Sequence, residues 1–124
     1  MSIRDKIFAA NDIRTEVVDI PEWGVKVELR GKSVEQQWKL IEKCRRPDGS
    51  IDSELLSVET ILACSYDPDT GERVFEDADR DMLRKKASGP FQKLLAAANR
   101  VAGLEDEATV VANLDEAQDA DSSS

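Results

Sequence analysis

The stretch TEVVDIPEWGVKVELR, residues 15–30, decides the fold class of this chain. Its second half, residues 25–30, alternates apolar and charged side chains, which is the period-2 pattern of a half-buried strand. Residues 15–20 form a second run rich in β-branched residues, and the PEWG sequence at 21–24 between the two runs favours a turn. The simplest connection is an antiparallel β-hairpin over about residues 14–30. A lone hairpin is unstable in water, so other elements must cover its apolar face.

Helical patterns dominate the rest of the chain. Ser33 followed by Gln36 is a capping-box pattern, and the stripe behind it contains Trp38, which we therefore expect in the core. A short helical turn is also expected at residues 3–10, although a lone helix of that length is marginal in water. Together the patterns predict an α+β, mostly helical domain over residues 1–104. Its four main helices are expected at about residues 33–45, 53–66, 77–88 and 90–103.

Charge is unevenly distributed along the 124 residues. The chain has 26 acidic and 17 basic residues, a net charge of −9, and seven of the acids lie in residues 105–124, which contain no Lys or Arg. A strongly acidic tail of this kind is repelled by nucleic acid and by anionic membranes, so we expect neither as a partner. Its first part keeps helical apolar spacing and fits a marginal helix that orders only on a partner, whereas the end is polar. The apolar positions are Leu104, Ala108, Val111 and Leu114.

The sequence offers little for catalysis. It has no His and no Gly-rich phosphate loop, so we expect no enzyme activity, no cofactor and no use of ATP. The segment Asp67–Gly71 lacks the spacing of a calcium loop and predicts a tight turn. The acids at 76–81 are interpreted as a helix start, with a divalent metal as the less favoured alternative. Cys44 and Cys64 are expected to be buried free thiols.

Two of these stretches together resemble a known family. Residues 23–30, WGVKVELR, are similar to its "WG-x-V-x-V-R" strand, and residues 67–75, DPDTGERVF, to its "D-x-x-T-G-x-x-x-F" turn, which acids and a Leu, here Leu83, follow in the next helix. The family is that of the tail assembly chaperones of long-tailed bacteriophages. The resemblance covers roughly residues 14–104.

The resemblance implies a function in the cytoplasm of an infected host cell. Such chaperones bind the long, helical tape measure protein and keep it soluble while tail tube subunits polymerise around it, and they are generally absent from the finished virion. A programmed frameshift often extends them into a longer product that recruits tail tube protein. An exposed apolar helical seam would aggregate if left bare, so a helical binder that shelters it fits this task.

Candidate contact residues for such a partner lie on the hairpin and on the last helix, although the same residues fit the core equally well. A homo-oligomer is an open alternative for these surfaces. Two rival functions also stay open: an acidic adaptor that binds a basic protein through the tail, and a metal-assisted hydrolase that uses Asp77–Asp81. The candidate contact residues are Trp23, Val25, Val27, Leu29, Phe91, Leu94, Leu95 and Val101.

Overall fold

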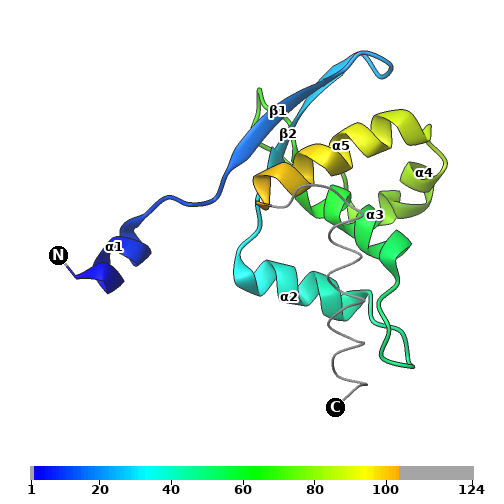
Figure 1. The fold of residues 1–124 in the computed structure, drawn as a ribbon. Helices are drawn as coiled ribbons and strands as arrows, with labels where there is room; N and C mark the ends of the chain where they lie inside the picture. Colours follow the sequence, from blue (N-terminus) through cyan, green and yellow to red (C-terminus); the bar gives the residue numbers. More distant parts are fainter. Residues whose placement is uncertain (1, 104–124) are drawn as a thin grey trace.

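The structure, a computed structural model, describes residues 2–103 and confirms the α+β class (Figure 1). A short N-terminal helix is followed by a β-hairpin, two helices, a third short strand and two further helices. The predicted acidic extension, residues 105–124, lies outside the described residues. In chain order the elements are α1 (Ile3–Ala9), β1 (Thr15–Ile20), β2 (Val25–Arg30), α2 (Val34–Lys43), α3 (Ser53–Cys64), β3 (Ser65–Tyr66), the 3-10 turn η1 (Asp77–Asp79), α4 (Arg80–Arg84) and α5 (Ser88–Val101).

The hairpin has the two predicted antiparallel strands. Strands β1 and β2 pair antiparallel from Thr15 opposite Arg30 to Ile20 opposite Val25. Strand β3 then pairs antiparallel with β2 and completes a three-stranded sheet in the order β1-β2-β3. The sequence pattern predicted helix through Tyr66, and this was wrong. Helix α3 ends at Cys64 because the backbone of the next two residues bonds to β2 instead of continuing the helix.

The main core lies between the hairpin and the helices α3 and α5. Helix α5 crosses the hairpin, and α3 packs against α5 (Figure 1). The inward side chains of β1 and β2 meet the apolar stripe of α5 there, which is the cover that the isolated hairpin needed. The core residues are Ile20, Val27, Leu29, Val58, Ile61, Leu62, Cys64, Leu83, Leu94, Leu95, Ala97, Ala98 and Val101.

Helix α2 packs on a second, smaller cluster with α3. This cluster contains Leu40, Ile41, Cys44 and Leu56. Helix α2 begins at the predicted capping box, in which the Ser33 hydroxyl accepts a hydrogen bond from the Gln36 backbone N–H at 3.2 Å. Since the cluster is small, α2 is held by less apolar contact than α5.

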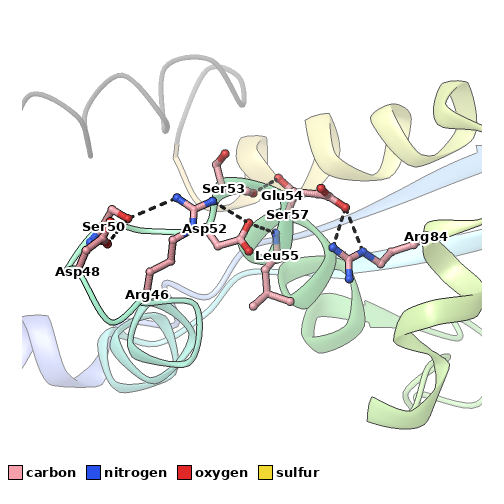
Figure 2. A network of polar contacts seen from close by, with 9 residues as sticks. All are labelled: Arg46, Asp48, Ser50, Asp52, Ser53, Glu54, Leu55, Ser57 and Arg84. Carbon is pink, nitrogen blue, oxygen red and sulfur yellow. Dashed lines mark hydrogen bonds and ion pairs between the residues drawn. The ribbon is translucent and has the colours of Figure 1, made fainter.

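The loop between α2 and α3 is fixed by its own polar side chains (Figure 2). The Asp48 carboxylate accepts hydrogen bonds from the Ser50 backbone N–H at 2.9 Å and from the Ser50 hydroxyl at 2.6 Å. Asp52 caps α3 by accepting from the Leu55 backbone N–H at 3.1 Å. An Arg46 nitrogen lies 3.8 Å from the same Asp52 carboxylate. These local bonds position the start of α3.

Two helix boundaries differ from the sequence predictions. The helix expected at 77–88 is shorter, because it consists of the single turn η1 followed by α4 and ends at Arg84. Helix α5, expected from about residue 90, begins at Ser88, so Pro90 lies in its first turn, where a proline displaces no helical hydrogen bond. At its other end α5 stops before Gly103, whose φ of +82° is the left-handed conformation of a helix C-terminus.

Candidate binding surfaces

An apolar depression of about 380 Å³ lies beside the hairpin turn, and we call it the hairpin surface. Its floor is part of the main core, but Val25, Val74 and Met82 remain exposed on it. Trp23, whose placement was uncertain from sequence, is partly buried here and packs against the main core. The lining residues are Trp23, Val25, Val27, Val74, Phe75, Asp79, Met82, Leu83 and Lys86.

A second apolar depression of about 420 Å³ lies between α2, α3 and α5, and we call it the helix groove. Val34 and Trp38 of α2 are 76% and 58% exposed beside it. The prediction that Trp38 belongs to the core was therefore wrong: the α2 stripe buries Leu40 and Ile41 but leaves its first turns uncovered within the described residues. The lining residues are Lys32, Ser33, Val34, Gln37, Trp38, Ile41, Ser53, Leu56, Ser57, Thr60, Leu95, Asn99 and Ala102.

The helix groove contains a buried polar group that sequence analysis did not find. Asn99 of α5 is only 7% exposed, and its side-chain Nδ2 has no hydrogen-bond partner in the described part of the chain. A buried amide left unpaired is destabilising, so such groups are normally satisfied by a neighbour or a bound partner. The only sequence signal was a polar residue inside the apolar stripe of the last helix.

The eight candidate contact residues divide into two groups. Those available at the surface are Trp23 and Val25, on the hairpin surface, and the partly buried Phe91 of α5. The other five are buried in the main core, although Val27 also lines the hairpin surface and Leu95 also lines the helix groove. Their role in binding a partner stays a prediction. The core residues of the set are Val27, Leu29, Leu94, Leu95 and Val101.

A buried carboxylate connects three helices. Glu59 of α3 is 3% exposed, and its side chain binds the Arg80 guanidinium of α4. Its other oxygen lies 3.1 Å from Nζ of Lys43 in α2. The Glu59 hydrogen bond raises the pKa of Arg80, which keeps the guanidinium charged. The carboxylate is paired with both cations, so this arrangement fixes the positions of α2, α3 and α4 relative to one another.

The arginines of two basic runs, Arg45-Arg46 and Arg84-Lys85-Lys86, make local ion pairs. Arg84 donates to Glu54 of α3 at 2.7 Å and so ties α4 to α3 (Figure 2). Arg45 donates to the Glu42 carboxylate at 2.8 Å. Because these side chains already have acidic neighbours in the fold, they contribute less positive charge to a surface for an acidic partner.

The two cysteines are free and buried, as predicted. Burial is the main cause that raises the pKa of Cys44 to about 11, with the nearby Glu59 carboxylate adding to it. Burial likewise raises the pKa of Cys64. Both thiols are therefore protonated near neutral pH and poor nucleophiles.

The acidic motifs also have local partners. The turn at 67–71 forms as predicted, with the Asp67 carboxylate accepting from the Asp69 backbone N–H at 2.8 Å and Gly71 at a φ of +76°. Asp79 accepts from the Glu76 backbone N–H at 2.8 Å at the start of η1. Within residues 2–103, no three Asp, Glu, Cys or His side chains gather as a metal site would require.

No helix in that range has the length and apolar character to cross a membrane.

Comparison with solved structures identifies a protein of the same fold. The bacteriophage HK97 tail assembly chaperone superposes with a TM-score of 0.50 at 21% sequence identity, over 82% of this chain and 95% of that one. No protein-family model matches the chain. No curated protein sequence matches it either. At this identity the likeness concerns the fold, and a shared fold does not by itself carry a shared function.

Proposed function

We propose that this chain is a tail assembly chaperone of a long-tailed bacteriophage, a binding protein and not an enzyme. It binds the tape measure protein in the host cytoplasm, keeps it soluble without ATP and helps to recruit tail tube subunits. It leaves before the virion is complete. The observation that carries the proposal is the fold shared with the HK97 tail assembly chaperone. The resemblance of residues 23–30 and 67–75 to motifs of that family supports it independently.

The hairpin surface is the site that we assign to the tape measure protein. It presents Val25, Val74 and Met82 next to the partly buried Trp23, so an apolar helical stripe can bury its side chains there. Aromatic side chains that pack partly on a buried core, as Trp23 does, are typical anchors of such contacts. Binding by apolar burial alone needs no nucleotide, which agrees with an ATP-independent holding function.

Co-expression with the tape measure protein from the same gene cluster tests this assignment. We expect the native chain to move most of the tape measure protein into the soluble fraction. The double variant Val25→Ser, Met82→Ser should lose most of this effect, because it removes apolar area without touching the core. Pull-down of the tape measure protein from the same lysates measures binding directly.

The hairpin offers a matched control in Val17→Ser. Val17 is 52% exposed, close to the 47% of Val25, but it lies on the opposite face of the hairpin. This control should keep full solubilising activity. If the native chain leaves the tape measure protein insoluble, the proposed function is wrong. Loss of binding on deletion of residues 105–124, with Val25→Ser, Met82→Ser unaffected, would favour the acidic adaptor instead.

A further inference from the structure

The described residues do not fully cover the helix groove. Trp38 and Val34 stand exposed along one side of it, and Leu56 and Leu95 form its apolar floor. The unpaired Nδ2 of Asn99 lines the same groove. An apolar groove with one buried donor fits an amphipathic helix that brings a hydrogen-bond acceptor along its edge.

The described chain ends at the mouth of this groove. Ala102 lines the groove, and the left-handed Gly103 turns the chain away from the axis of α5. A neighbouring depression that includes Gly103 shares Lys32, Ser33, Val34 and Ala102 with the groove. Whatever follows Gly103 therefore starts next to the groove and needs no linker to reach it.

The charge around this exit is positive on balance. Arg14, Lys32 and Asp12 line the depression at Gly103, and among residues 2–103 neither of the two cations forms a salt bridge. The first residues beyond Leu104 are Glu105, Asp106 and Glu107. Acids in the first turn of a helix are favourable, and here they would also face two cations.

The sequence of residues 104–114 has the pattern that the groove requires. Its apolar residues Leu104, Ala108, Val111 and Leu114 are spaced by four and three, so a helix places them on one face. Eleven helical residues extend about 16 Å. That length is comparable with the two turns of α2, from Val34 to Ile41, that line the groove.

We propose that residues 104–114 of this chain form a helix that lies in the helix groove and covers Trp38. The apolar face of this C-terminal segment packs on Trp38, Ile41 and Leu95, and its acidic start faces Arg14 and Lys32. A side chain or backbone acceptor of the segment satisfies Asn99. Because the segment is attached at the groove's mouth, its effective concentration is in the millimolar range, and a weak contact is enough to keep it in place.

Trp38 fluorescence in the full chain tests this proposal. Trp23→Phe leaves Trp38 as the single tryptophan, since the chain has two. Adding Val111→Asp and Leu114→Asp should shift the Trp38 emission to longer wavelength and raise its acrylamide quenching constant about twofold, because the indole becomes exposed. Far-UV circular dichroism of the same samples verifies that the body of the protein stays folded.

A matched control carries the same two charges on the other face of the segment. Thr109→Asp, Asn113→Asp should leave the Trp38 emission and quenching as in the parent chain, since a helix places residues 109 and 113 away from the apolar stripe. The proposal is overturned if Val111→Asp, Leu114→Asp leaves Trp38 unchanged, or if both double variants change it equally. Protection that is lost on dilution would assign the groove to a second copy instead. No partner protein is needed, so the result is independent of tape measure binding.

Discussion

The hairpin surface and the helix groove are both apolar, but they differ in what lies beneath them. The hairpin surface is an exposed edge of the main core, where β2 and α4 already pack on α3 and α5. The helix groove is a seam, because α2 packs on α3 in the second cluster and lies across the depression from α5. A surface of the first kind stays in place without a partner. The position of the helices that line a seam depends on the group that fills it.

We expect the main core, which is the larger of the two apolar clusters, to contribute most of the free energy of unfolding. Leu94, fully buried in the main core, is our test position. Leu94→Ala should lower the free energy of unfolding by about 3 kcal/mol, through lost apolar burial and the cavity left behind. Urea unfolding followed by circular dichroism measures it. Met82→Ala, on the exposed hairpin surface, should change stability by less than about 0.5 kcal/mol; similar losses for both would show that the surface is part of the core.

Glu59 of α3 pairs with Lys43 of α2, beside the helix groove, and with Arg80 of α4, beside the hairpin surface. Removing its charge should therefore weaken the packing of both helices on α3. Glu59→Gln leaves Arg80 and Lys43 without their counter-charge, and we expect a loss of about 2 kcal/mol in unfolding free energy. The same urea experiment measures it. The control Glu54→Gln breaks the exposed pair with Arg84 and should give no measurable change. An unaffected Glu59→Gln variant would contradict the role of this carboxylate in holding α2 on α3.

The cysteines report on the two regions separately, because Cys44 lies in the second cluster and Cys64 in the main core. If α2 opens locally while the main core stays closed, Cys44 should react with a thiol reagent about tenfold faster than Cys64 in the native protein. Mass spectrometry of partly labelled protein distinguishes the two sites. Both should react at similar rates in denaturant, and equal rates in the native state would mean that the regions open together.

The smallest expected effect concerns the contact between β1 and α5 in the main region. Arg100 donates to the Glu16 carboxylate at 2.9 Å, and this hydrogen bond lowers the pKa of Glu16. The resulting stability is present above the ordinary pKa of 4.5 and is lost as the pH falls through the lowered value in the folded state. Glu16→Gln should therefore cost about 0.5 kcal/mol at pH 7 and nothing in strong acid. Thermal unfolding across this pH range measures the difference, and a constant difference would contradict it.

Local patterns were sufficient where neighbouring residues determine the structure. The alternation at 25–30 predicted the hairpin with its strand bounds, and the Ser33–Gln36 pattern predicted the start of α2. These features depend on hydrogen bonds and side-chain alternation within a few residues. Strand β3 could not be predicted in the same way, since Ser65 and Tyr66 continue a helical pattern and become a strand only by pairing with β2, more than thirty residues earlier.

By itself the sequence determined the α+β class, the hairpin, the capped start of α2, the two buried thiols and the family that the chain resembles. Only the tertiary structure decided which apolar faces are covered: Leu94 and Trp38 both lie on helical stripes, yet the first is enclosed by the hairpin and the second borders an open groove. It also decided that Glu59 is buried between two cations. The physical reason is that periodicity fixes which side of a helix is apolar, whereas burial depends on which distant element packs against it.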